Sequence, residues 1–304
     1  MKPIIFGEVL FDVFNNEVEI LGGAPFNAAW HLKGFGLSPI IISRIGNDKA
    51  GQEVIKAMNN WGLSDIGIQF DSDHPTGKVS ITQTGKDHSF TIHENAAFDF
   101  ITDELMDFSF DQQEVPLFYH GTLVLRSENP RRALTKFKRK FSGTIFYDVN
   151  LRDPWWDIDT INCELGRSNL VKCNEEELAV LARLFGIKDS GLENTAAAFI
   201  KKFSLDKIYI TMGAEGAFLV DKFGQTVSSP QISVKNIADT VGAGDAFSSV
   251  VMLGNIYGWE DKVSLERAAD FAAKICSRKG AVQNDAALYE YYLKNWGLKH
   301  DESR

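Results

Sequence analysis

The stretch "ADTVGAGDAF", residues 238–247, places two carboxylates and two glycines where a turn leads into a segment with helical spacing of apolar residues. The first turn of a helix exposes N–H groups that lack intrahelical acceptors, and it carries the positive end of the helix dipole. Glycines let the backbone approach an anion closely, so the backbone donors of Ala243, Gly244 and Asp245 are predicted to form an anion cradle. A phosphoryl group in transfer is an anion that such donors stabilise.

An acidic residue beside this cradle repels phosphate unless it takes part in the chemistry. Asp245 is therefore a candidate general base that accepts the proton of an attacking hydroxyl, a role worth about 10²–10⁴-fold in rate. The alternative is an aspartate that only complements the helix dipole in a first turn. For an isolated Gly-Ala-Gly-Asp this alternative is favoured, and the spacing alone does not decide between the two.

Three further segments have residue types that suit phosphate or metal chemistry. "LGGAPFN", residues 21–27, lets the backbone approach a ligand at its glycines and offers a donor and an acceptor on Asn27. "TMGAEG", residues 211–216, predicts a tight turn able to line a phosphate chain. "NEEE", residues 174–177, places carboxylates where Mg²⁺ could be held through water. Each also has a plain structural interpretation as a helix start or a turn.

Competing phosphate and metal motifs are missing from the sequence. It has no G-x-x-x-x-G-K-[ST], and no G-x-G-x-x-G follows the first expected strand, which disfavours P-loop and dinucleotide-binding proteins. The six histidines show neither ligand spacing nor a G-x-S-x-G partner, so we interpret them as structural.

Short apolar runs alternate with longer segments of helical spacing, a rhythm typical of an α/β fold with a mainly parallel sheet. A single domain is expected to span residues 1–304. The expected strands are residues 3–9, 38–46, 117–125, 143–149, 168–173 and 206–213. The expected helices are residues 26–35, 49–62, 129–140, 243–257, 265–277 and 286–296.

Residues 13–21 and 66–101 break this rhythm with short alternating runs, two of which are joined by "GKD", a predicted hairpin turn. We interpret them as one small antiparallel flap that acts as a lid over a ligand, the alternative being a surface insertion without function. Four apolar residues of the flap could supply a homodimer face or pack on the sheet below: Val79, Ile81, Phe90 and Ile92.

Composition narrows the classes of partner. With 41 acidic against 32 basic residues the net charge is −9, which argues against a nucleic-acid partner. Three cysteines without a C-x-x-C pair predict neither a disulfide framework nor a zinc site and favour a reducing compartment. No signal peptide and no membrane span is expected, so a soluble cytoplasmic protein is predicted. Only the tail "KHDESR", residues 299–304, is expected to be loose.

Taken together, the motifs resemble one family across nearly the whole chain, the ribokinase or PfkB family of carbohydrate kinases. "DTVGAGDAF" is similar to the C-terminal signature of that family and "GGAPFNAAWHLKGFG" to its N-terminal glycine motif. "NEEE" resembles its magnesium-linked N-x-x-E, and "TMGAEG" its nucleotide-binding T-x-G-x-x-G. "DVNLRDPWW" is most like the N-x-R stretch of the fructokinases, and "GEVLFDVF" and "PTGKVS" are also fructokinase-like.

The resemblance implies a doubly wound α/β sheet with a β-flap lid, ATP as phosphate donor and Mg²⁺ as partner. It implies that Asp245 is the base, that the backbone of Gly242, Ala243 and Gly244 is the anion hole, and that Arg152 faces the transferring phosphate. It also implies a monovalent cation such as K⁺ near Asp239. The residues implied to bind sugar hydroxyls are Asp12, Gly23 and Asn27.

The nucleotide-binding residues implied by the resemblance lie in three segments. Asn174 and Glu177 would hold water around Mg²⁺. Thr211, Gly213 and Gly216 belong to the nucleotide-binding turn. Asn284 ends "RKGAVQN", residues 278–284, where the family closes on the adenine.

One departure from the family pattern bears on the acceptor. Ribokinases have an acidic ribose contact after the strand that ends near residue 125, where this chain has Arg126. Ribose is thereby disfavoured, and fructose is the expected substrate. The alternatives are a kinase for another sugar or a nucleoside, and a non-catalytic relative that binds sugar or nucleotide. An arginine could instead suit an acid sugar such as 2-keto-3-deoxygluconate, although the aromatic-plus-Arg pattern of those kinases is missing around "HENAAFD".

Overall fold

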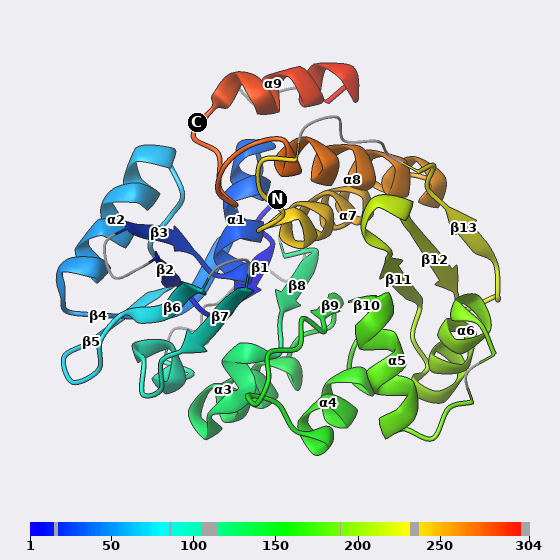
Figure 1. Ribbon diagram of the computed structural model, residues 1–304, viewed down its shortest axis with the longest axis horizontal. Coiled ribbons are helices and arrows are strands. Elements are labelled where there is room, and N and C mark those ends of the chain that lie inside the picture. Colours follow the sequence, from blue (N-terminus) through cyan, green and yellow to red (C-terminus); the bar gives the residue numbers. More distant parts are fainter. Residues whose placement is uncertain (15–17, 85–86, 105–114, 189, 232–236, 299–304) are drawn as a thin grey trace. The chain divides into compact units, whose positions relative to one another are not determined.

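A computed structural model describes residues 1–14, 18–84, 87–104, 115–188, 190–231 and 237–298, and these fold into two compact units (Figure 1). Unit 1 comprises residues 1–115, 127–141 and 280–304, and unit 2 comprises residues 116–126 and 142–279. Each unit has strands of a mainly parallel sheet with flanking helices. The predicted α/β class is confirmed, whereas the tail 299–304 and most of the "GKD" turn lie outside the described residues.

Unit 2 contributes six adjacent strands in the order β13-β12-β11-β10-β9-β8. The four strands from β8 to β11 are parallel, and the last two turn back antiparallel. Strands of a sheet covered on both faces read as continuous apolar runs, and β9 and β10 are buried over most of their length. The strands are β8 (Leu117–His120), β9 (Thr144–Asp148), β10 (Leu170–Asn174), β11 (Lys207–Thr211), β12 (Ala217–Asp221) and β13 (Thr226–Ser228).

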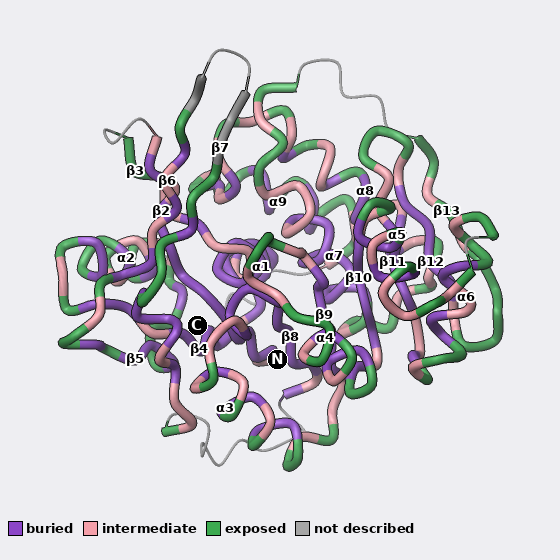
Figure 2. The backbone as a smooth tube through the Cα atoms, turned by 60° about the horizontal axis from the view of Figure 1, so that its bottom comes forward, coloured by how far each residue is buried: buried purple, intermediate pink, exposed green. Residues whose placement is uncertain are grey.

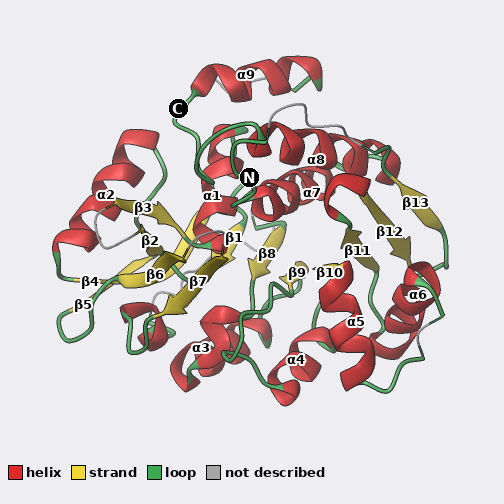
Figure 3. Ribbon diagram, in the orientation of Figure 1, coloured by secondary structure: helices red, strands yellow, loops and turns green. Residues whose placement is uncertain are grey.

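Helices cover both faces of these strands (Figure 3). Helices α5 and α6 pack against one face, and α8 packs on the other together with α7, with which it makes an extensive contact. Helix α7 is buried through most of its length (Figure 2), because its own residues are apolar on nearly all sides. The helices are α4 (Ile158–Leu165), α5 (Glu175–Leu184), α6 (Leu192–Phe203), α7 (Ala243–Tyr257) and α8 (Asp261–Cys276), with 3₁₀ turns η2 (Leu123–Arg126) and η3 (Gly213–Glu215).

Unit 1 contributes three parallel strands in the order β1-β4-β5 and a separate four-stranded sheet in the order β3-β2-β6-β7. The strands are β1 (Ile4–Phe6), β2 (Leu10–Phe14), β3 (Val18–Gly22), β4 (Ile40–Gly46), β5 (Ile68–Asp71), β6 (Gly77–Thr84) and β7 (Asp87–Ile92). The helices are α1 (Ala24–Gly34), α2 (Lys49–Trp61), α3 (Glu128–Lys138), α9 (Ala286–Asn295) and the 3₁₀ turn η1 (Ala97–Phe100).

The small sheet corresponds to the predicted flap, with two differences. Its outer pairs are antiparallel, but β2 and β6 run parallel, because the chain passes through α1, β4 and α2 between them. Residues 68–71, predicted within the flap, instead extend the main sheet beside β4. The predicted strand 117–125 also ends early, at His120, and continues as the 3₁₀ turn η2.

The apolar residues of the flap mostly face inward. Val79, Ile81 and Ile92 are buried within unit 1, whereas Phe90 is 63% exposed. Among the four residues, only Phe90 is therefore exposed. Within the described residues, no helix combines the length and hydropathy that crossing a bilayer requires.

Helix α1, which begins beside Gly23, is anchored in unit 1 by a buried aromatic cluster. Trp30 stacks on Trp61 with ring centroids 5.2 Å apart, and His31 Nδ1 lies 2.9 Å from the hydroxyl of Tyr289 in α9. Burial lowers the pKa of His31 to about 3, outweighing a hydrogen bond with the backbone of Ala281 that raises it. His31 is therefore neutral in the folded protein at neutral pH.

Acid should destabilise unit 1 through His31. Because its folded pKa lies below the unfolded value of 6.5, the stabilisation is complete above pH 6.5 and is lost as the pH falls toward about 3. The expected loss is about 1.4 kcal/mol for each pH unit in that window. Urea unfolding followed by tryptophan fluorescence should show this slope, and His31→Gln should flatten it.

His93→Gln, which changes an exposed histidine of the same unit, is the matched control and should keep the wild-type slope. An unchanged slope in His31→Gln would contradict the assignment of a neutral buried imidazole.

Candidate active site

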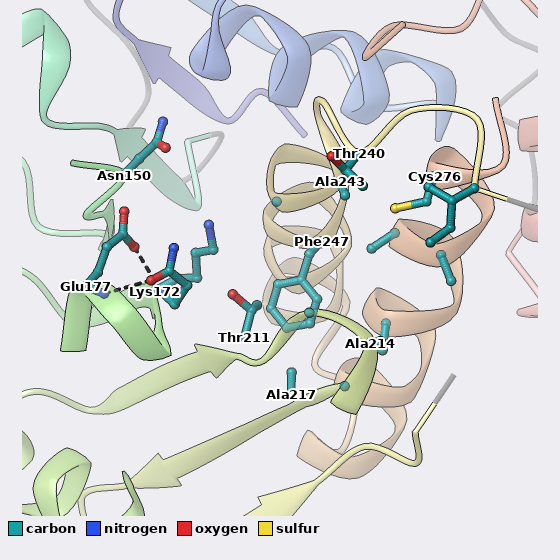
Figure 4. Close-up of a pocket in the computed structure, with 18 of the residues that line it drawn as sticks. Asn150, Lys172, Glu177, Thr211, Ala214, Ala217, Thr240, Ala243, Phe247 and Cys276 are labelled. Carbon is teal, nitrogen blue, oxygen red and sulfur yellow. Dashed lines mark hydrogen bonds between the residues drawn. The ribbon is translucent and has the colours of Figure 1, made fainter. Parts of the chain in front are cut away.

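A cavity of about 620 Å³ lies in unit 2, at the carboxyl ends of β10 and β11 and beside the first turn of α7. In open α/β sheets this edge is where ligands bind, and the volume suits a nucleotide-sized molecule. Its polar side chains include Arg152, Lys172, Asn174, Glu177 and Thr211. The other part of its wall is formed by small and apolar residues, among them Phe247, Ala269, Ala273 and Cys276 (Figure 4).

The first turn of α7 follows a glycine and lines the cavity. Gly242 is the N-cap with φ 80°, a left-handed conformation that favours glycine, and the helix begins at Ala243. Ala246 N donates to Gly242 O at 2.9 Å, and Ala243 N makes a longer bond of 3.3 Å to Thr240 O. Ala243 and Gly244 line the cavity, so the positive end of α7 faces it.

Lys172 is a site residue that the sequence analysis missed. Its side chain comes from β10 and lines the cavity, although the residue is only 6% exposed (Figure 4). A Cβ on Gly244 would lie 3.1 Å from Lys172 Nζ, so the ammonium group sits against the turn that forms the cradle. The sequence feature that could have indicated this residue is a lysine within the otherwise apolar run "NLVKC".

Neighbouring carboxylates keep Lys172 charged. Burial by itself lowers its pKa, but the charges of Asp148, Glu177 and Asp245 outweigh burial and raise the pKa above the usual value. Lys172 Nζ lies 3.1 and 3.3 Å from the two carboxylate oxygens of Asp148. The cavity therefore contains a fixed cation beside the helix terminus, an arrangement that attracts phosphate.

Asp245 lies in the first turn of α7, partly buried, and its charge acts on Lys172. Asp239, upstream of the same turn, accepts a hydrogen bond from Val241 N at 3.0 Å. Its own backbone N–H donates to Cys276 O at 3.2 Å, which ties the turn to the end of α8. The predicted residues of the "DTVGAGD" motif are thus collected around one helix terminus.

Asn174 and Glu177 form a capping box at the start of α5 (Figure 4). Asn174 Oδ1 accepts from Glu177 N at 2.7 Å, and Glu177 Oε2 accepts from Asn174 N at 2.9 Å. Glu177 Oε1 also accepts from Leu151 N at 2.8 Å, which fixes the segment leading to Arg152. The structure therefore gives Glu177 a structural role in addition to its place on the cavity wall.

These hydrogen bonds bear on how the residues of the cavity could hold a metal ion. Among the described residues, no group of three or more His, Cys, Asp or Glu side chains could hold a metal ion directly. Both oxygens of Glu177 accept from backbone N–H groups, and each carboxylate oxygen has capacity to accept a further hydrogen bond. This donor set suits Mg²⁺ held through water, since that ion usually keeps several waters.

The turn after β11 is as predicted from "TMGAEG". Thr211 is the register partner of Asn174 on the neighbouring strand, so both side chains stand at the same edge of the sheet. Gly213 has φ 55° and Gly216 has φ 93°, and both line the cavity. A Cβ on Gly216 would lie 2.7 Å from Ser229 Oγ, so this position requires glycine for space as well as for conformation.

Arg152 and Arg126 both lie in unit 2, in different surroundings. Arg152 is exposed and lines the cavity, and its guanidinium donates to Leu151 O at 2.8 Å. Arg126, at the end of η2, stacks over the ring of Trp155 with its guanidinium carbon 4.7 Å from the ring centroid. Trp155 belongs to the same "DVNLRDPWW" stretch as Arg152.

Unit 1 brings together the predicted sugar ligands Asp12 and Asn27. A Cβ on Gly22 would lie 3.6 Å from Asn27 Oδ1 and 3.7 Å from Asp12 Oδ2, so both side chains converge on that glycine. Gly23 has φ 108°, and a Cβ there would meet Glu8 O at 2.7 Å. Asn284 also belongs to unit 1, where it is exposed.

Comparison with known proteins identifies relatives over most of the chain. A model of the pfkB family of carbohydrate kinases matches residues 11–287. The uncharacterized sugar kinase PH1459 from Pyrococcus horikoshii is 29% identical over 294 residues, covering 90% of this chain and 89% of that protein. Its crystal structure superposes with a TM-score of 0.79 over 92% of this chain and 93% of that chain at 26% identity, and a complex with ATP is also known.

Two further relatives are named for different acceptors of the phosphate group. Fructokinase-2 of Oryza sativa subsp. japonica is 26% identical over 312 residues, covering 92% of this chain and 89% of that protein. Aminoimidazole riboside kinase of Salmonella typhimurium is 26% identical over 262 residues, covering 81% of this chain and 78% of that protein. The similarity therefore identifies the family but not the acceptor.

The capping box predicts a stability effect at Glu177. Replacing Glu177 by Gln removes the charge and one of the two oxygens that accept backbone N–H groups. Hydrogen bonds to charged groups contribute about 1.5–3 kcal/mol, so the free energy of unfolding should fall by about that much. Glu176→Gln, at an exposed position in the same first turn, should change it by under about 0.5 kcal/mol in urea unfolding. Equal effects of the two variants would contradict the structural role of Glu177.

Proposed function

Because the chain belongs to the pfkB family of carbohydrate kinases, we propose that it transfers the γ-phosphate of ATP to a primary hydroxyl of a free sugar, fructose first among the candidates. The observation that carries this proposal is the cavity of unit 2 where the first turn of α7, the Lys172 ammonium and the N-x-x-E pair meet. Fructokinase-like sequence around Arg152 supports the choice of fructose.

Asp245 is proposed as the general base. The sugar oxygen forms a bond to the γ-phosphorus while the bond from that phosphorus to the leaving oxygen of ADP breaks, and Asp245 accepts the hydroxyl proton. At the positive end of α7 a carboxylate is stabilised as the anion that base catalysis requires. Gly242, Ala243 and Gly244 are proposed as the anion hole that stabilises the charge growing on the phosphoryl oxygens, with the Ala243 N–H group exchanging its 3.3 Å bond to Thr240 O for the phosphate.

ATP and Mg²⁺ fit the cavity residues. The small and apolar wall residues offer an apolar surface to a base, and the turn 213–216 offers backbone to a phosphate chain. Lys172 and Arg152 supply positive charge, and Asn174 and Glu177 would hold the waters of Mg²⁺. When bound, Mg²⁺ neutralises charge on the phosphate oxygens.

Asp12, Gly23 and Asn27 are proposed to bind the sugar hydroxyls. An amide and a carboxylate that converge on one glycine offer both donors and acceptors, which vicinal hydroxyls need. The small sheet of unit 1 is proposed as the lid that excludes water from the reaction. Thr211, Gly213, Gly216 and Asn284 are proposed nucleotide contacts, and Asp239 a neighbour of a monovalent cation such as K⁺.

An acid sugar is the second candidate acceptor, favoured by Arg126. Its guanidinium is held over Trp155 in the stretch that also carries Arg152, so two arginines are available in that region of unit 2. A fixed guanidinium binds a carboxylate through paired hydrogen bonds.

A panel of acceptors in an ADP-release assay tests the proposal. Fructose should give the highest kcat/KM, with ribose, 2-keto-3-deoxygluconate and aminoimidazole riboside well below it. A second measurement with Mg²⁺ removed by EDTA should abolish turnover, because the proposed transfer needs the metal.

Turnover on another acceptor with none on fructose would overturn the substrate. If 2-keto-3-deoxygluconate is preferred, Arg126→Leu should raise its KM and leave the KM for ATP unchanged. Absence of ADP release with every acceptor would overturn the kinase assignment of this chain's site.

A further inference from the structure

A carboxylate beneath the cavity binds three different donors. Asp148, at the end of β9, has an exposed fraction of 0%. Lys172 Nζ lies 3.1 and 3.3 Å from its two oxygens, Ser248 Oγ donates to Oδ2 at 2.8 Å, and the hydroxyl of Tyr119 donates to Oδ2 at 3.2 Å. A buried carboxylate is tolerated only when it is paired and hydrogen-bonded in this way.

The donors on Asp148 come from the elements that form the cavity. Lys172 is the register partner of Asp148 on the adjacent strand β10, and its side chain lines the cavity. Ser248 lies on α7, three residues after Asp245, so the two side chains lie on neighbouring positions of one helix face. One carboxylate therefore joins the cavity's lysine to the helix whose first turn forms the anion cradle.

Asp148 itself is fully buried and is not among the residues that line the cavity. It therefore has no direct route to a bound ligand, and any influence on one passes through its partners. Lys172 is the partner with such a route, because its ammonium group lies against Gly244 in the first turn of α7. An unbranched lysine side chain has many rotamers, and an ion pair with two oxygens restricts them to the orientation seen here.

We infer that Asp148 is a positioning residue for phosphoryl transfer, which holds the Lys172 ammonium at the anion cradle of α7 so that it contacts the phosphate groups of the nucleotide. This inference rests on the proposed kinase function and adds two residues to it. Lys172 touches the nucleotide and stabilises the charge of the transferring group. Asp148 acts on the nucleotide through Lys172, and its hydrogen bond with Ser248 also connects β9 to α7.

The two roles predict a specific pattern in steady-state kinetics. Lys172→Gln should lower kcat/KM for ATP on the order of 10²-fold, the loss typical when one donor to a developing anion is removed. Asp148→Asn, which keeps the shape and hydrogen-bonding capacity of the side chain, should lower it about 10-fold or more, as removal of a residue that orients a ligand group does. The KM for the sugar should be unchanged in both variants.

The double variant Asp148→Asn/Lys172→Gln separates positioning from general damage. If Asp148 acts through Lys172, the double variant should match Lys172→Gln alone within about twofold, because coupled residues are not additive. If the losses instead multiply, Asp148 contributes independently and the inference is overturned. Wild-type kcat/KM for ATP in Asp148→Asn would overturn it as well.

The chain offers a matched control and a safeguard against unfolding. Lys207→Gln breaks another lysine–aspartate pair of unit 2, the one between Lys207 and Asp261. Neither residue lines the cavity, so this variant should leave kcat/KM for ATP unchanged. If Asp148→Asn does not fold, the comparison of Lys172→Gln with the charge-neutral double variant still decides the question. Thermal unfolding of each variant identifies any that are unfolded. Failure of the kinase proposal is distinguishable, because the wild-type protein would then release no ADP.

Discussion

The positive end of helix α7, opened toward a cavity by glycine, is the feature on which the rest of the site depends. Gly242 adopts the left-handed conformation that starts the helix, and Gly244 leaves the space that a side chain would take from Lys172. With larger residues at these two positions the N–H groups would be covered and the lysine displaced. The bonds that Asp239 makes with Val241 N and Cys276 O hold this turn in place.

Electrostatic balance explains why so many charged groups can be buried together here. Lys172 is surrounded by the carboxylates of Asp148, Glu177 and Asp245, and their charges raise its pKa despite burial. Glu177 is in turn fixed by three hydrogen bonds. Its carboxylate accepts from the backbone N–H groups of Leu151 and Asn174, and its own N–H group donates to the side chain of Asn174. Such preorganisation means that the charges of the site need little rearrangement when a phosphate enters.

Much of this arrangement could be predicted from the sequence, because backbone requirements leave clear residue signals. The helix over residues 243–257 was predicted with the bounds that the structure has, since glycines mark both of its ends. The glycines of "TMGAEG" likewise predicted the tight turn that the structure has at residues 213–216. Lys172 and Asp148 were missed, because a pair between adjacent strands depends on sheet register, which the sequence does not display. Residues 68–71 were assigned to the flap for the same reason.

The fold leaves the identity of the acceptor to a few side chains. Relatives in the same family are named for different acceptors, so specificity comes from a small set of side chains rather than from the sheet. Arg126 illustrates the point, since its position over Trp155 could not be derived from the sequence. It depends on how the chain after β8 meets the loop after β9.

The turnover of Asp245→Asn tests the central claim most directly, with Asp261→Asn as the matched change in the first turn of another helix of unit 2. If a carboxylate at the end of α7 removes the hydroxyl proton, Asp245→Asn should lower kcat by about 10²–10⁴-fold and leave sugar and ATP binding nearly unchanged. Asp261→Asn should keep the wild-type kcat. An Asp245→Asn protein that turns over as fast as the Asp261→Asn protein would contradict the account.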